Sequence, residues 1–427
     1  MLTRYFLLLS FTFTVFFAQA QTFYRIGSEE NVETEPLFGI LLAGGATDNN
    51  QGMAWLAERA NGGDVVVLRA SGSDGYNNYI YSQLGVEVNS VTSIVITSSE
   101  QANSEEVCEA VENAELIFIA GGNQWNYYSH WKGTCLQQAI NNHVNEKAAP
   151  IGGTSAGLAV LGEVVFTAEN NSVWSEEALN DPYHFRVKLS NEFLDIPFMG
   201  NIVTDSHYNA IYGDNNNRHG RHMAFMARMI TDWGMEAKGI GVNEFTAVAV
   251  DENGTARVFG HPNYSDYAYF LKSNAAPEVC EEGEPITWFN NQMAVSVYEV
   301  KGDFQGSNTF DMATWEDGTG GEWWAWYILE GELIQIPESH VYVQELEVFQ
   351  GFSIFPNPAD KYITLENFSS EPVISYSIIN LAGATIKKGI PSSDRLSKID
   401  LSGIEQGVYM LKVSFSNREE VRKIIKK

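Results

Sequence analysis

The middle of this 427-residue chain predicts an α/β fold, in which helices cover both faces of a mostly parallel sheet. Two observations lead to this prediction. Short apolar runs alternate with segments of helical spacing, and several of the runs end in glycine or polar residues. In such sheets, sites form in the loops beyond the carboxyl ends of the strands. We therefore expect the residues that bind substrate or take part in a reaction to lie directly after the apolar runs.

Five apolar runs are predicted to form the strands of this sheet. They cover residues 39–43, 65–70, 91–97, 116–120 and 149–152. Helices are predicted between them at 52–60, 105–114 and 134–145. Residues 276–337 change to short strand-like pieces and glycine-rich turns, which predicts a β-rich extension of the same domain. Its tryptophans suit core packing, which we favour, or a carbohydrate-binding face; they are Trp288, Trp315, Trp323, Trp324 and Trp326.

The amino terminus is typical of an export signal covering residues 1–20. Arg4 is its only charged residue, an apolar run follows over 5–17, and Ala18-Gln19-Ala20 has the form of a signal-peptidase site. This run is shorter than the roughly 20 residues that a spanning helix needs. No later stretch is long and apolar enough to cross a membrane, so we expect an exported protein without a transmembrane segment.

The carboxyl-terminal region, residues 352–427, differs from the rest of the chain in charge. It holds 11 basic and 8 acidic residues, although the whole chain has a net charge of −28. Short strand-like runs separated by turns predict a small β-sandwich here. A domain for residues 21–340 and a linker at 341–351 would precede it. The acidity of the chain argues against nucleic-acid binding, which requires a clustered basic surface.

Gly153-Thr154-Ser155-Ala156-Gly157 is the strongest chemical motif, because it follows a predicted strand and precedes a helix-like segment. This is the context of the G-x-S-x-G nucleophile elbow, which projects a serine hydroxyl into a cleft. The amide of Ala156 can face a developing oxyanion. Gly121-Gly122-Asn123-Gln124 follows another strand, so Gly122 can supply a second amide and Gln124 a polar contact to substrate.

A serine nucleophile needs a base, and the base needs an orienting acid. His207 is the predicted base, since it follows the apolar strand end at 202–205 and lies 52 residues after Ser155. The acid stays open on spacing alone among Glu169, Glu176, Glu177 and Asp181. His219 and His222 form an H-x-x-H pair without a third ligand, and we interpret them as exposed helix residues. Three cysteines allow one disulfide, but the spacing does not choose the pair.

Residues from about 38 to 337 resemble the serine peptidase family S51, in its cyanophycinase-like branch. The resemblance rests on Leu42-Ala43-Gly44-Gly45, on the 120–124 and 152–157 motifs, and on residues 175–183, 204–208 and 218–228. It implies a class I glutamine-amidotransferase-like α/β/α sandwich and a Ser-His-acid triad that needs no cofactor. Carried over to this sequence, the acid would be Glu177. Asp205, Arg218 and Arg221 would join Gln124 in the substrate pocket.

The resemblance also implies a substrate and a destination. The cyanophycinase-like branch cleaves cyanophycin, an aspartate polymer bearing arginines, to β-aspartyl-arginine. Residues 209–217 depart from the family by an asparagine-rich expansion, with Asn216 where the first arginine of a run would be. Another β-aspartyl or acidic peptide therefore stays open as substrate.

The carboxyl-terminal region resembles the type A sorting domain of the type IX secretion system. Phe355-Pro356-Asn357-Pro358-Ala359, Leu381-Ala382-Gly383, Gly407-Val408-Tyr409 and the basic tail at 423–427 carry this resemblance. It implies contact with the secretion machinery, passage through the outer membrane, and release or attachment at the cell surface.

The preferred hypothesis is thus a secreted serine peptidase. Two other hypotheses stay open: an esterase of the α/β-hydrolase fold, and an inactive surface-binding protein on the same scaffold. The esterase fold usually places its histidine much farther downstream. The sequence does not fix the oligomeric state, and a homodimer is one expected form.

Overall fold

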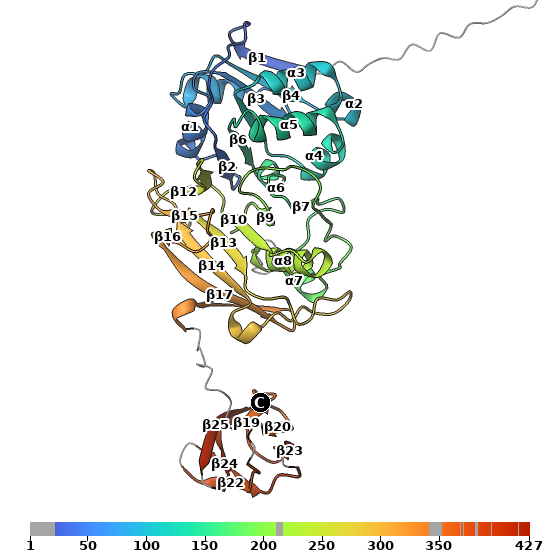
Figure 1. Cartoon of the computed structure of the whole chain (residues 1–427), viewed down its shortest axis with the longest axis vertical. Helices are drawn as coiled ribbons and strands as arrows, with labels where there is room; N and C mark the ends of the chain where they lie inside the picture. Colours follow the sequence, from blue (N-terminus) through green and yellow to red (C-terminus); the bar gives the residue numbers. More distant parts are fainter. Residues whose placement is uncertain are drawn as a thin grey trace, which may run out of the picture. The chain divides into compact units, whose positions relative to one another are not determined.

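The computed structural model describes residues 22–210, 217–340 and 352–427, except positions 368, 370, 381, 382, 394 and 417. The predicted export signal at 1–20, the predicted linker at 341–351 and most of the 209–217 expansion lie outside these residues. The chain divides into two compact units, residues 1–341 and 342–427, and each is described by itself (Figure 1).

A ten-stranded mixed sheet forms the first half of the amino-terminal unit. Five of its strands run parallel to their neighbours, and they are the five that the apolar runs predict. In spatial order the strands are β1 (Thr22–Gly27), β4 (Ser90–Val95), β3 (Asp64–Arg69), β5 (Leu116–Ile119), β6 (Ile151–Thr154), β2 (Ile40–Ala43), β11 (Ala247–Val250), β12 (Thr255–Phe259), β15 (Thr309–Asp311) and β16 (Gly318–Thr319).

Helices cover both faces of this sheet, because successive strand residues point to opposite sides. In β2, Ile40 and Leu42 pack in one core cluster with α3 (Glu105–Asn113) and α5 (Cys135–Asn145). Leu41 and Ala43 pack in another cluster with α1 (Asn50–Glu58) and the π-helical turn Tyr79–Gln83. The predicted α/β/α arrangement is confirmed. Short helices complete it: α2 (Ser99–Ala102), α4 (Gln124–Trp131) and α6 (Ala156–Ala159).

A second, six-stranded sheet forms the other half of this unit. Its order is β18 (Glu332–Pro337), β17 (Gly321–Leu329), β14 (Val295–Lys301), β13 (Tyr267–Ser273), β10 (Lys238–Val242) and β9 (Ile202–Asp205). Only β9 and β10 pair in parallel. Its core cluster includes residues of α7 (Ser175–Asn180) and α8 (His219–Trp233). A separate hairpin pairs β7 (Val165–Phe166) with β8 (Leu189–Ser190).

The predicted β-rich extension contributes strands to both sheets. β14, β17 and β18 belong to the six-stranded sheet, whereas β15 and β16 form an edge of the ten-stranded sheet. Trp288, Trp315 and Trp326 are at most 2% exposed, which confirms core packing for these three tryptophans. The short turns η2 (Asn290–Gln292) and η3 (Glu338–His340) complete this region.

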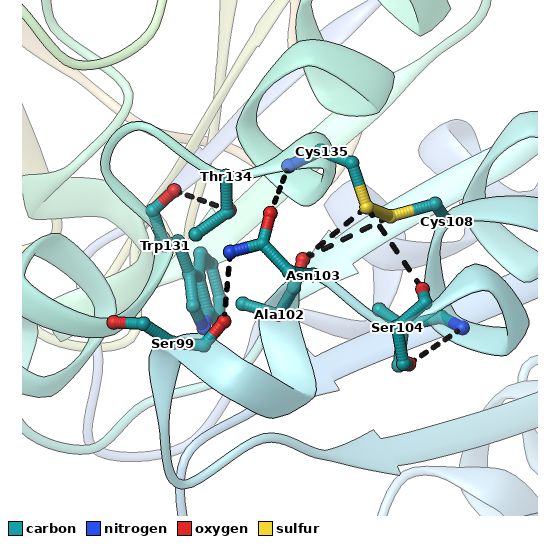
Figure 2. The surroundings of a disulfide bond; sticks show 9 residues. Ser99, Ala102, Asn103, Ser104, Cys108, Trp131, Thr134 and Cys135 are labelled. Atoms are coloured by element: carbon teal, nitrogen blue, oxygen red, sulfur yellow. Dashed lines mark hydrogen bonds between the residues drawn. A yellow bond between two sulfur atoms is a disulfide. The ribbon is translucent and has the colours of Figure 1, made fainter.

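A disulfide joins Cys108 in α3 to Cys135 at the start of α5 (Figure 2). Asn103 supports the junction, because its side-chain oxygen accepts the Cys135 amide and its nitrogen donates to the Ser99 carbonyl. The third cysteine, Cys280, is buried and has a free thiol.

Two antiparallel sheets build the carboxyl-terminal unit. One orders β19 (Phe352–Phe355), β20 (Tyr362–Asn367) and β23 (Leu396–Asp400). The other orders β22 (Thr385–Gly389), β21 (Ser375–Asn380), β24 (Gly407–Ser414) and β25 (Glu419–Lys426). One core cluster takes side chains from both sheets, among them Ile363, Ile378 and Leu411. No described helix of the whole chain is long and apolar enough to cross a membrane.

Candidate active site

Ser155 stands on a strained turn between β6 and α6. Its φ of 52° lies in the left-handed region, which non-glycine residues rarely occupy outside functional turns. The turn is tight: a Cβ on Gly157 would lie 2.0 Å from the carbonyl oxygen of Ile119 in β5. The Ser155 amide donates to the Ala43 carbonyl at the end of β2. The elbow predicted from the sequence is therefore present, held by the two strands that flank β6.

The hydroxyl of Ser155 lies next to the imidazole of His207. Ser155 Oγ and His207 Nε2 are 2.7 Å apart, and Nδ1 on the other side of the ring is 2.7 Å from Glu244 Oε1. The His207 and Glu244 side chains are 20% and 29% exposed. His207 follows β9, and Glu244 comes two residues after β10. A carboxylate, an imidazole and a hydroxyl thus form one continuous hydrogen-bonded chain.

The prediction of Glu177 as the acid beside His207 is wrong on this geometry. Glu177 lies near the start of α7, where it accepts the Trp174 amide and forms a 2.7 Å ion pair with Arg186. Another candidate, Asp181, accepts the amides of Tyr183 and Gly283. Glu244 was missed because only acids between Ser155 and His207 were considered. The signal that could have found it is its place directly after an apolar strand.

Gly44 and Gly45 hold the histidine and the acid in place. The Gly44 carbonyl accepts the His207 amide at 2.8 Å, and the Gly45 carbonyl accepts the amide of Phe245 at 3.1 Å. Gly45 has a φ of 98°, and a Cβ there would lie 2.5 Å from His207 Nε2. The imidazole therefore occupies space that only glycine leaves. On the other side, Asn209 Oδ1 accepts the Glu244 amide at 2.9 Å.

A cavity of about 280 Å³ opens beside Ser155, and most of the predicted pocket residues line it. Gly122 and Ala156, the expected oxyanion donors, lie in its wall with Gln124. Gln124 comes from the first turn of α4 and donates weakly, at 3.5 Å, to the Phe166 carbonyl. Asp205, Arg218 and Arg221 complete the charged part of the lining. The structure therefore brings all predicted site residues except Glu177 to this cavity.

The charged groups of this cavity form a buried cluster. Arg221 Nε donates to Asp205 Oδ2 at 2.7 Å, and its Nη1 donates to Ser172 Oγ at 2.7 Å. Arg218 Nη1 donates to the Ser206 carbonyl at 2.7 Å and lies 3.5 Å from Asp205. Burial raises the pKa of Asp205, but the two arginines outweigh burial and hold that pKa below its usual value. One carboxylate and two guanidinium groups leave the cluster a net positive charge.

The interpretation of His219 and His222 as exposed helix residues is also wrong. His222 is fully buried and bonded to Tyr208 Oη and the Val203 carbonyl, both at 3.0 Å. His219 is 8% exposed and stacks on Trp326. Both face inward because α8 packs against the six-stranded sheet. Among the described residues, no cluster of three or more His, Cys, Asp or Glu side chains could hold a metal ion.

Two regions of the chain are similar to known proteins. Residues 69–258 match the family model described as Peptidase family S51, and residues 353–427 match the Secretion system C-terminal sorting domain. Cyanophycinase from Synechococcus elongatus is 28% identical over 278 residues, which are 60% of this chain and 76% of that protein. Cyanophycinase from Trichormus variabilis is 25% identical over 221 residues, covering 51% of this chain and 66% of that protein.

Among solved structures, a peptidase from an acI-B1 Actinobacterium can be superposed on this chain; the match covers 65% of this chain and 98% of the chain of that peptidase. The sequence identity is 16% and the TM-score 0.42. The sorting domain implies contact with the type IX secretion machinery and marks proteins for the cell surface or the exterior. The comparisons thus support a serine-type peptidase: residues 69–258 are similar to peptidase family S51, and residues 353–427 are similar to a secretion system sorting domain.

Proposed function

We propose that Ser155, His207 and Glu244 form the catalytic triad of this secreted peptidase. The observation that supports this most directly is the pair of 2.7 Å contacts that His207 makes, one with Ser155 and one with Glu244. Glu244 accepts a hydrogen bond from the Nδ1–H group and so leaves Nε2 unprotonated and facing the serine. It also stabilises the imidazolium that forms when Nε2 takes the proton.

The reaction proceeds in two steps through an acyl-enzyme. Ser155 Oγ attacks the substrate carbonyl while His207 takes its proton, and His207 then gives that proton to the leaving amine. Water then enters, loses a proton to His207 and attacks the ester carbonyl; as the ester bond breaks, His207 returns that proton to Ser155 Oγ and the carboxylic acid product leaves. The amides of Gly122 and Ala156, in the wall of the same cavity, are the proposed donors to the oxyanion.

The proposed substrate is a β-aspartyl peptide of the cyanophycin type. Two relatives with that activity in their names support it, and so does the charge of the cavity. Arg218 and Arg221 outnumber Asp205 there, which suits a substrate carboxylate near the scissile bond. Gln124, with an amide donor and acceptor, suits the substrate backbone.

One experiment tests the reaction and the substrate together. The purified protein is incubated with cyanophycin, with β-aspartyl dipeptides and with ordinary acidic peptides, and the products are identified by mass spectrometry. A fluorophosphonate probe, which labels activated serines, reports the nucleophile independently of substrate choice. We expect β-aspartyl products and a label on Ser155, both absent in Ser155→Ala.

The outcomes separate the two parts of the proposal. Hydrolysis that persists in Ser155→Ala would refute the nucleophile. A labelled Ser155 without release of β-aspartyl products would refute the substrate and keep the triad. Hydrolysis of simple esters alone would favour the esterase hypothesis, and a protein that is neither labelled nor active would favour an inactive binding protein.

A further inference from the structure

The loop that carries Gly122, a proposed oxyanion donor, lies directly against the turn that carries the nucleophile. It joins β5 to α4. A Cβ on Gly121 would lie 3.5 Å from the Cβ of Ser155, and a Cβ on Gly157 would lie 2.9 Å from the Ala120 carbonyl oxygen. A rotation within this loop therefore changes the groups that surround the Ser155 hydroxyl.

The peptide between Gly121 and Gly122 can in principle face the cavity in two ways. It is trans, so its carbonyl and its amide point in opposite directions. Rotation of the peptide plane changes the φ of the following residue, and glycine at that position accepts either sign of φ. In one orientation the amide faces the cavity and can donate to an oxyanion. In the other orientation the carbonyl oxygen faces the cavity and repels negative charge.

The hydroxyl of Tyr127 holds the carbonyl side of this peptide. Tyr127 Oη donates to the Ala120 carbonyl at 2.8 Å and to the Gly121 carbonyl at 3.1 Å, so the two carbonyls share one proton. The Tyr127 side chain is 1% exposed, and its ring centroid lies 4.7 Å from that of Trp131, also in α4. Because the ring is enclosed, the hydroxyl has little freedom to follow a rotating peptide.

The donor is permanent, and the amide at the other end of the peptide is unused. Burial raises the pKa of Tyr127 to about 12, so its hydroxyl keeps its proton at any pH at which His207 serves as a base. Gly122 lines the cavity beside Ser155, and no hydrogen bond within the described part of the chain takes up its amide.

We propose that Tyr127 is a positioning residue for catalysis: its hydroxyl holds the Gly121 carbonyl away from the cavity and so presents the Gly122 amide to the oxyanion. The inference rests on the proposed function, in which Gly122 donates to that oxyanion, and it names the group that sets the orientation of the donor. Tyr127 is not among the described residues that line the cavity, so it acts through the peptide alone.

The first test is Tyr127→Phe, which removes the hydroxyl and keeps the ring. We expect kcat to fall about tenfold while KM stays within about twofold, because the oxyanion exists only after Ser155 has attacked. The loss should be smaller than the roughly 10²- to 10³-fold that removal of an oxyanion donor costs, since the amide is still present but is turned away part of the time.

A transition-state analogue distinguishes positioning from a general structural defect. A peptide aldehyde forms a tetrahedral adduct with Ser155, and its affinity should fall in Tyr127→Phe in the same proportion as kcat. Affinity for intact substrate, measured in the Ser155→Ala background, should not change when Tyr127→Phe is added. Equal weakening of both ligands would show a structural defect and refute the positioning role.

Tyr128, the next residue of α4, supplies the matched control. Its hydroxyl donates to Ser190 Oγ and accepts a hydrogen bond from Lys132 Nζ, both at 2.8 Å, so Tyr128→Phe also removes two hydrogen bonds. Tyr128 lies outside the described lining of the cavity, and Tyr128→Phe should keep kcat within about twofold of the wild type. A wild-type kcat in Tyr127→Phe, or an equal loss in both variants, would overturn the proposal.

Two non-natural side chains keep the proposal testable if Tyr127→Phe does not fold. Tyr127→4-aminophenylalanine places an N–H donor where the hydroxyl was, and Tyr127→4-methylphenylalanine has the same shape without a donor. The amino variant should keep kcat within about threefold of the wild type, whereas the methyl variant should lose about tenfold. Equal rates in these two variants would refute the positioning role.

The rate of fluorophosphonate labelling separates this inference from the choice of substrate. Phosphonylation of Ser155 also places a negative oxygen among the oxyanion donors, so Tyr127→Phe should be labelled about tenfold more slowly than the wild type. That result supports the inference even if the proposed substrate is wrong. Equal labelling rates would refute the inference and leave the triad standing, whereas absence of labelling in the wild type would refute the proposed function and the inference with it.

Discussion

Glu244 contacts the His207 ring, with 2.7 Å between Glu244 Oε1 and His207 Nδ1. None of the described acidic residues that precede His207 in the chain makes this contact. Along the chain, the proposed triad therefore has the order nucleophile, base, acid. Because β9 and β10 are parallel neighbours, the loops after them deliver His207 and Glu244 to the same edge of the sheet. The pairing follows from strand order and not from distance in sequence.

Replacing Glu244 should therefore damage catalysis far more than replacing Glu177. Glu244→Gln keeps the size of the side chain but no longer stabilises the imidazolium, so we expect kcat to fall by about 10³-fold or more. Steady-state kinetics on the best substrate measures this effect. Glu177→Gln, the matched control, loses only a partly exposed ion pair with Arg186 and should stay within about twofold of the wild type. The reverse ranking would restore Glu177 as the acid.

Gly45→Ala should inactivate the enzyme by displacing the His207 ring. The new Cβ would lie 2.5 Å from Nε2, and a shift of about 1 Å in a catalytic group costs about 100-fold in rate. Gly62→Ala is the matched control, because Gly62 also has a positive φ, 81°, but has open space around its Cβ position. Both variants should lose about 1 kcal/mol of unfolding free energy. Equal activity in the two variants would contradict the steric role of Gly45.

Low pH should destabilise the amino-terminal unit, because its buried histidines become protonated when it unfolds. Burial lowers the pKa of His143 to about 4 and of His219 to about 3. In the unfolded chain these groups protonate near their ordinary value of about 6.5. Their contribution to stability is therefore complete above that pH and is lost as the pH falls toward the folded-state values.

Between its folded-state and unfolded-state pKa values, each such histidine should change the free energy of unfolding by about 1.4 kcal/mol per pH unit. Chemical denaturation at a series of pH values from 7 to 4 measures this slope. In His143→Gln, unfolding should take up about one proton fewer, so the free energy of unfolding should depend less steeply on pH. An unchanged slope in that variant would show that His143 does not titrate on unfolding.

Loss of the Cys108–Cys135 disulfide should destabilise the protein without touching the site. The bond joins residues 27 positions apart in the sequence, and for a loop of this size chain entropy predicts a stabilisation of about 3.5 kcal/mol. Cys108→Ser with Cys135→Ser should lower the unfolding free energy by that amount in a denaturant titration and leave kcat unchanged. Cys280→Ser, at the buried free thiol, is the control and should change the stability less. A double variant as stable as the wild type would contradict this expectation.

Apolar periodicity and strand-end chemistry predicted the five parallel strands and two of the three residues of the proposed triad. The parallel strands are short, buried runs, and Ser155 and His207 follow two strand ends, so local sequence was sufficient for them. Glu244 obeys the same rule, since it comes two residues after β10. It was not predicted because every acid proposed from the sequence lies between Ser155 and His207, whereas Glu244 follows His207.

Burial of His219 and His222 could not be predicted from local sequence. It depends on tertiary packing. Nearly every residue in the first part of α8 is buried, because the helix packs against the six-stranded sheet and is covered by other elements as well. The pairing of Cys108 with Cys135 depends in the same way on how α3 packs beside α5.

The proposed triad is divided between the two sheets of the amino-terminal unit. Ser155 follows β6 of the ten-stranded sheet, whereas His207 and Glu244 follow β9 and β10 of the six-stranded sheet. Neither half alone holds a complete proton relay. The proposed relay therefore forms only when the two sheets have packed together, so a chain in which one sheet has not yet folded lacks it.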